Sequence, residues 1–87
     1  MSKRAVILSM AVVHSGAGYD EYQRTIERID KRIEGLERIA ADVWLIPLPS
    51  GLPALGQLVS VCVFSSYEYK VLHIEHEAVW THYGNKK

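Results

Sequence analysis

The sequence predicts a single α+β domain in which a small, antiparallel-rich sheet packs on one long helix. An apolar run lies near the N-terminus, a long stretch with helical spacing of its apolar residues follows, and short runs rich in β-branched residues make up the rest. One helical segment among several strand-like ones is typical of an α+β domain. The 87 residues are enough for one domain, and the predicted order of elements is β-α-β-β-β.

The first predicted strand runs over residues 5–13, which are rich in Val, Ile and Leu. Such a run is typical of a strand covered on both sides, or covered on one side and paired with a partner. The basic residues Lys3 and Arg4 before it and the small residues 15–18 after it also have the order of a secretory signal peptide within residues 1–18. Removal of that segment would leave the helix with too little sheet to cover it, so we interpret the run as a strand.

The long helix is predicted over residues 19–41, and the rest of the chain is expected to pack on it. Its apolar residues recur at alternating spacings of four and three, which places them in one stripe: Tyr22, Ile26, Ile29, Ile33, Leu36 and Ala40. Asp20 with Gln23 resembles a capping box at the helix start. Gly35 is a weak point, since glycine costs about 1 kcal/mol relative to alanine in a helix interior. The stripe also fits a coiled-coil seam, but the apolar segments on both sides favour packing on a sheet of the same chain.

The second predicted strand covers residues 42–48 and is followed by a loop rich in proline. Pro47 and Pro49 cannot donate a hydrogen bond to a strand ladder. This strand should therefore lie at an edge of the sheet or end at these prolines.

Residues 55–64 contain no charged residue and fit two structures. Their β-branched residues alternate with Ser60, Cys62 and Phe64, which is the period of a strand. Their apolar residues also satisfy a helical stripe, and Pro53 would suit a helix start. We favour the strand because of the high β-branched content, and the choice over residues 53–66 stays open.

The last strand is predicted over residues 69–83, with alternate side chains on opposite faces. The expected core face consists of Leu72, Ile74, His76, Ala78 and Trp80. The expected outer face consists of Val71, His73, Glu75, Glu77 and Val79.

Composition excludes several functional classes. Ten basic and ten acidic residues leave no formal net charge, which disfavours a protein whose main task is to bind nucleic acid. The single cysteine, Cys62, excludes an internal disulfide and a thiolate-rich metal site, and we expect it to be a buried, inert thiol in a cytoplasmic protein. No apolar stretch reaches the roughly 18–20 residues of a membrane span. No motif calls for a cofactor.

Two groups of residues are candidate ligands for a metal or an anion. His73, Glu75 and Glu77 share one strand face and could offer a nitrogen and two carboxylates to a metal, although a polar outer strand face has the same pattern. His14 precedes the helix start with small residues between, where an anion could bind, although glycines before a helix also simply form a turn.

Aromatic residues are numerous in the C-terminal third of the chain. Trp80 and Tyr83, with Tyr67 and Tyr69, are candidate residues for binding a protein partner if they lie at an open end of the sheet.

Several short motifs resemble a known family. They are Leu8-Ser9-Met10-Ala11, Gly18-Tyr19-Asp20, Trp44-Leu45-Ile46, and Leu72-His73-Ile74 through Ala78-Val79-Trp80. Their order resembles the small ferredoxin-like subunit of the CRISPR adaptation complex and its stand-alone relatives. The resemblance implies a homodimer on a ferredoxin-like fold, and it favours a helix over residues 55–64. In that family an Asp ends the first strand and is associated with metal-dependent nuclease activity, whereas Ala11 stands nearest to that position here.

Two functional classes follow from these patterns. We favour a non-catalytic protein-interaction or binding module that acts as a homodimer, of phage or mobile-element origin, because no catalytic constellation is visible and the uncharged segment is long for so small a core. The alternative is a small metal-dependent nuclease or nucleic-acid-binding protein that uses His14 or the His73 face.

Overall fold

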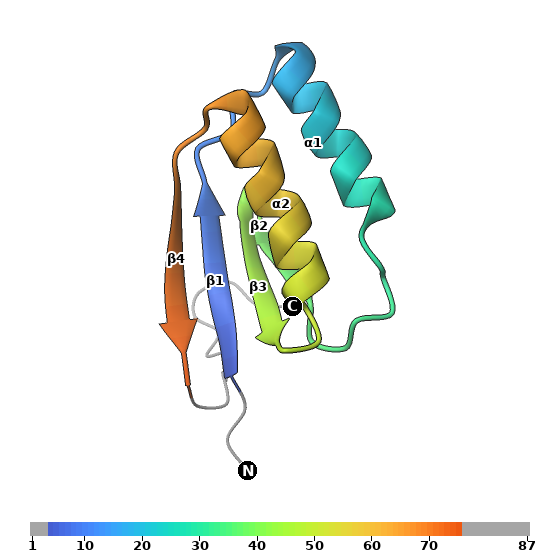
Figure 1. The fold of residues 1–87 in the computed structure, drawn as a ribbon, viewed down its shortest axis with the longest axis vertical. Coiled ribbons are helices and arrows are strands. Elements are labelled where there is room, and N and C mark those ends of the chain that lie inside the picture. The colour runs from blue at the N-terminus through green and yellow to red at the C-terminus, as the bar shows by residue number, and fades with distance from the viewer. Residues whose placement is uncertain (1–3, 76–87) are drawn as a thin grey trace, which may run out of the picture.

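The computed structural model describes residues 4–75, which form an open antiparallel sheet with two helices on one of its faces (Figure 1). The elements in chain order are β1 (Arg4–Met10), α1 (Gly16–Arg28), β2 (Glu37–Ala40), β3 (Val43–Leu48), α2 (Leu52–Ser65) and β4 (Tyr69–Ile74). The strands lie in the order β2-β3-β1-β4, and all neighbours are antiparallel. The predicted α+β class is confirmed. The predicted order β-α-β-β-β is wrong, because an additional strand, β2, follows α1 and a second helix lies between β3 and β4.

The first strand, predicted over residues 5–13, is confirmed as β1 but already ends at Met10, and it lies between β3 and β4. Alternate side chains of β1 point into the core under the helices, and Val6, Leu8 and Met10 are buried there. Trp44 and Ile46 of β3 lie opposite Leu8 and Val6 on the same face. The core is therefore a layer between this face of the sheet and the two helices.

The long helix predicted over residues 19–41 is wrong in its second half. Its expected start is wrong as well, because α1 begins at Gly16 after Ser15, so Asp20 lies inside the helix and does not form a capping box. α1 ends at Arg28, because Ile29 already has an extended backbone. The Asp30 carboxylate accepts a hydrogen bond of 2.9 Å from the Arg32 backbone N–H, which stabilises a turn in place of another helical turn. Gly35 has a φ of +90°, a conformation that glycine adopts readily and other residues rarely do. The chain thus turns back after α1 and enters β2.

The apolar stripe that suggested one long helix is still directed at the core, except for Ala40, which is exposed at the end of β2. Tyr22 and Ile29 are buried, and Ile26 packs against them. Ile33 and Leu36 also pack against the core, but from the loop between α1 and β2. The spacing of apolar residues is therefore satisfied by two different backbone conformations.

The strand favoured over residues 55–64 is also wrong, since these residues belong to α2. Pro53 lies in the first turn of α2, where its missing N–H costs no hydrogen bond. Ala54, Leu58, Val61 and Cys62 form the buried face of this helix. The helical stripe and the family resemblance pointed to this result. Burial raises the pKa of the Cys62 thiol, which agrees with the expected inert cysteine.

The strand predicted over residues 42–48 is confirmed as β3, which ends at Leu48 directly before Pro49. It lies inside the sheet, between β2 and β1. Pro47 is tolerated there because β2 reaches only as far as Leu45.

The last predicted strand is confirmed as β4 for residues 69–74, while residues 76–83 lie outside the described residues. The assignment of its faces is wrong. Val71 and His73 pair with Leu8 and Val6, so they lie on the face that carries the helices. Leu72, which was expected in the core, lies on the opposite face and is 62% exposed. Within residues 4–75, neither helix has the length and apolar character needed to cross a bilayer.

Candidate functional site

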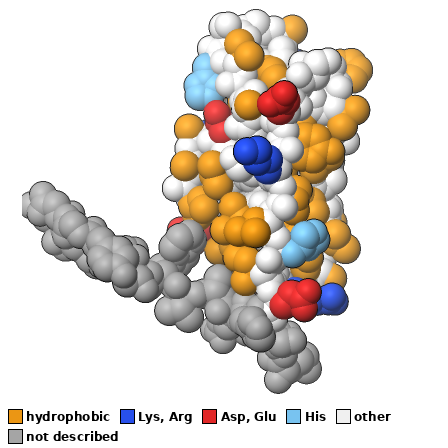
Figure 2. Space-filling view, turned by 90° about the vertical axis from the view of Figure 1, so that its left-hand side faces the viewer, with side chains coloured by type: hydrophobic (Ala, Val, Ile, Leu, Met, Phe, Trp, Pro, Cys, Tyr) orange, Lys and Arg blue, Asp and Glu red, His pale blue; other side chains and the backbone are white. Residues whose placement is uncertain are grey.

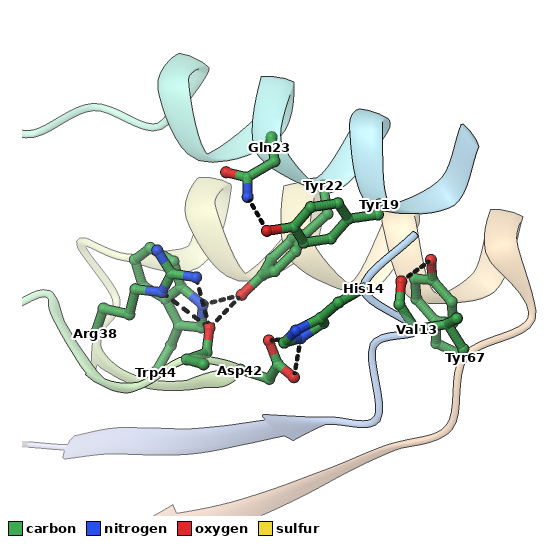
Figure 3. A network of polar contacts seen from close by, with 10 residues as sticks. Val13, His14, Tyr19, Tyr22, Gln23, Arg38, Asp42, Trp44 and Tyr67 are labelled. Carbon is green, nitrogen blue, oxygen red and sulfur yellow. Dashed lines mark hydrogen bonds and ion pairs between the residues drawn. The ribbon is translucent and has the colours of Figure 1, made fainter. Parts of the chain in front are cut away.

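A polar cluster at the end of the sheet brings together residues that are far apart in the sequence. The loop after β1 carries His14, and the turn between β2 and β3 carries Asp42. Nε2 of His14 lies 3.1 Å and 2.9 Å from the two carboxylate oxygens of Asp42 (Figure 3). His14 is half-exposed, and Asp42 is more enclosed.

The Asp42 carboxylate determines which ring nitrogen of His14 carries the proton. In the neutral ring, the proton belongs on Nε2, where it is donated to Asp42, and this leaves a lone pair on Nδ1. No residue in the described part of the chain forms a hydrogen bond with Nδ1. The ring stacks on Tyr19, with 5.2 Å between the ring centroids. An oriented imidazole with one free nitrogen can accept a proton from a bound molecule or donate a lone pair to a metal.

A hydrogen-bond network, buried at Trp44 and exposed at Arg38, holds the turn that carries Asp42. The Tyr22 hydroxyl donates to the Ala41 carbonyl at 3.0 Å and accepts from Nε1 of Trp44 at 3.0 Å. The Arg38 guanidinium donates to the same Ala41 carbonyl at 2.7 Å and 2.9 Å (Figure 3). It also lies over the rings of Tyr22 and Trp44. Burial raises the pKa of Tyr22, so its hydroxyl stays protonated as a donor. Asp42 is therefore positioned by the core and not by a loose loop.

The sequence missed Asp42 as a partner of His14. The two residues are separated by 28 positions, and no spacing rule connects a loop after the first strand to a turn between later ones. Ala11, directly after β1, donates its backbone N–H to the Glu68 carbonyl at 2.8 Å. The neighbouring Met10 donates its N–H to the carbonyl of Asp42 itself. The Asp42 carboxylate at this end of the sheet thus comes from the β2–β3 turn.

The second predicted ligand group is placed differently. His73 and Glu75 lie at the exposed C-terminal end of β4 and after it, and Glu77 lies outside the described residues. Within residues 4–75, no group of three or more His, Cys, Asp or Glu side chains is close enough to hold a metal ion.

The predicted partner-binding aromatics separate into two environments. Tyr67 is partly buried where it packs against Gly18, and its hydroxyl donates to the Val13 carbonyl at 3.4 Å. A Cβ at residue 18 would collide with that hydroxyl, so Gly18 is required for this contact. Tyr69 is exposed on β4. Trp80 and Tyr83 lie outside the described residues.

A second surface follows β4 and the adjacent flank of α2, and we call it the β4–α2 surface. It consists of the exposed residues Leu52 and Val63 on α2 and Tyr69 and Val71 on β4, together with the partly buried Leu55 and Val59 on α2. A groove between the helices, of about 480 Å³, is lined from α2 by Gln57, Ser60, Val61 and Phe64, so the stripe of Leu55, Val59 and Val63 lies on the flank turned away from α1. Seen from the β4 side, hydrophobic side chains cover much of the molecule and charged ones are scattered (Figure 2).

No protein-family model, no curated protein and no solved structure matches this chain.

Proposed function

We propose that this chain is a non-catalytic protein-interaction module that acts as a homodimer through the β4–α2 surface. The observation that carries the proposal is the exposure of apolar side chains there: Leu52 53%, Val63 66%, Tyr69 40% and Val71 38%. α2 contains no Asp, Glu, Lys or Arg at all, so its exposed flank has no charge to keep it in water. Exposed apolar surface that gathers on one side of a domain typically marks a site of protein association.

The size of the chain supports self-association. A domain of this length buries only about 60–65% of the surface of its unfolded chain, so its own core gives a small margin of stability. Two copies that cover the same surface on each other would remove apolar area from water at about 25 cal/mol per Å². A symmetric dimer uses one patch twice and needs no second interface.

We also propose that the fold is ferredoxin-like and related to the small subunit of the CRISPR adaptation complex. The β-α-β-β-α-β order and the strand order β2-β3-β1-β4 support this assignment. Ala11 at the end of the first strand supports the non-catalytic reading, because the family carboxylate is missing at that position.

Sedimentation velocity over a hundredfold range of protein concentration tests the proposal. We expect the weight-average sedimentation coefficient to rise from the monomer value to the dimer value. A coefficient that stays at the monomer value up to the highest concentration, with no partner recovered by affinity purification, would refute it.

One observation favours a second candidate function, a nucleic-acid-processing enzyme. The carboxylate-oriented His14 has a free Nδ1 at an exposed end of the sheet, and together with Asp42 it could remove a proton from a nucleophile or contribute ligands to a metal. The test is cleavage of single-stranded RNA and DNA with and without Mg²⁺ or Mn²⁺. Activity that is lost in both His14→Ala and Asp42→Asn would support this candidate, whereas no activity, or activity that survives both changes, would exclude the site.

A further inference from the structure

The two edges of the sheet are unequally protected. β2, one edge, has four residues, a register irregularity between Arg38 and Ala40, and two charged residues. Short length, bulges and charges are the devices that prevent an edge strand from pairing with another chain. β4, the opposite edge, has six residues in regular register with β1, and Lys70 is its one residue with a permanent charge.

The hydrogen bonds around β1 show which backbone groups of β4 face outward. The N–H of Ala11 points to β4, where it meets the Glu68 carbonyl, while the N–H of Met10 points to the other side. Because the direction of the backbone N–H alternates along a strand, the N–H groups of Ser9, Ile7 and Ala5 also point to β4. Their partners in register are Lys70, Leu72 and Ile74, and the backbone N–H and C=O groups of these residues are therefore hydrogen-bonded to β1. Tyr69, Val71 and His73 are left with N–H and C=O groups on the outer edge, which no strand within residues 4–75 covers.

From this pattern we propose that two copies pair their β4 strands antiparallel, with the two-fold axis at Val71, to form one continuous eight-stranded sheet. The proposal rests on the homodimer proposed above and names its contact. In this register Val71 lies opposite the partner's Val71, and Tyr69 lies opposite the partner's His73. All outward-facing residues of β4 then exchange N–H···O bonds with the outward-facing residues of the partner's β4.

Other registers are less favourable for physical reasons. An axis at Lys70 would place two ammonium groups directly opposite each other. An axis at Leu72 would pair Tyr69 with the partner's Glu75, which lies beyond the end of β4. The axis at Val71 avoids both and sets Lys70 opposite the partner's Leu72.

The same axis explains the apolar flank of α2. A two-fold axis perpendicular to the sheet places the helices of both copies on the same face. Tyr69 and Val71 lie on that face, because they pair with the buried Met10 and Leu8. They would form the floor of a furrow whose walls are the two α2 flanks. The apolar flanks of the two α2 helices would then face each other across this floor.

Charge-swap variants at the axis provide the test. Val71→Lys and Val71→Glu each set like charges opposite each other, so each should weaken the dimer at least about tenfold in dissociation constant. A mixture of the two should restore a dimer, because the charges are then complementary. Ala40→Lys, on the opposite edge, is the matched control and should dimerise like the wild type. Far-UV circular dichroism verifies that each variant is folded.

A cysteine at the axis gives a measurement that does not depend on added charge. In a Cys62→Ala background, Val71→Cys should form a disulfide-linked dimer on mild oxidation, and Ala40→Cys should not. Dimers of Val71→Lys as tight as the wild type, or no cross-link through Cys at position 71, would overturn the β4 pairing even if the wild type is a dimer. A wild type that is monomeric at all concentrations would refute the homodimer itself.

Discussion

The Tyr22 hydroxyl is the most constrained polar group in the core. Tyr22 is fully buried, and its oxygen both donates to the Ala41 carbonyl and accepts from Nε1 of Trp44. Within the described part of the chain, no buried side-chain nitrogen or oxygen lacks a hydrogen-bond partner. Removing one hydrogen-bond partner would therefore leave a buried polar group unpaired and lower the free energy of unfolding.

We predict that Tyr22→Phe lowers the free energy of unfolding by about 1–3 kcal/mol, because the buried Trp44 N–H loses its acceptor. Urea unfolding monitored by fluorescence measures it. Tyr19→Phe is the control: its hydroxyl bonds only the Gln23 amide in a partly exposed setting, so water can replace that bond. Equal losses in the two variants would contradict the role of the network.

The comparison of the wild type with Tyr22→Phe also gives a prediction for the pH dependence of stability. Burial raises the pKa of Tyr22 above its ordinary value of 10.0. The unfolded state then releases its proton at lower pH than the native state, so the stability from Tyr22 is complete below pH 10 and is lost as pH rises further. The stability gap between the wild type and Tyr22→Phe should narrow above that pH. A gap that is constant from pH 8 to 11 would contradict it.

At the scale of elements, α2 shows why alternation alone is a weak signal. Its Val residues at alternate positions fit a strand, but a helix places Leu58 and Cys62 on one face against the sheet. Strand β1 already has a neighbour on each side, and its core face needs a cover. A helix provides that cover while it satisfies its own backbone hydrogen bonds, and tertiary packing overrides the β propensity.

We predict that Leu58→Ala and Leu52→Ala, the same chemical change on two faces of α2, have very different costs. Leu58 is fully buried, so its truncation should cost about 2–5 kcal/mol. Leu52 is half-exposed, so its truncation should cost less than about 1 kcal/mol in dilute protein. Thermal or urea unfolding at low protein concentration measures both. Similar costs would mean that α2 does not dock by the face described.

At the scale of the whole molecule, the stability of the protein should depend on its concentration. A dimer that forms only from native chains stabilises them by mass action, by about 2.7 kcal/mol when free protein is a hundredfold above the dissociation constant. For a domain of this size, each kcal/mol corresponds to roughly 4–8 °C in Tm. We therefore predict a Tm that rises with wild-type concentration and stays constant for Val71→Lys. Scanning calorimetry or intrinsic fluorescence over a hundredfold range of protein concentration measures this dependence of Tm.

The sequence by itself determined the features that depend on local chemistry. The strand β1, the strand β3 with its end directly before Pro49 and the buried thiol of Cys62 all follow from composition and spacing over a few residues. The apolar stripe from Tyr22 to Ala40 also identified residues that reach the core, all except the exposed Ala40, although it could not show that the backbone changes conformation at Ile29. A periodic pattern constrains which side chains are buried, and a loop can satisfy it as well as a helix can.

Only the tertiary structure decided the features that depend on distant residues. The helix between β3 and β4, the face on which Val71 lies and the contact of His14 with Asp42 are set by how the strands order themselves in the sheet. Which edge is protected follows from that order as well. These outcomes depend on the competition among whole elements for one sheet face, and no window of a few residues contains the free energy of that competition.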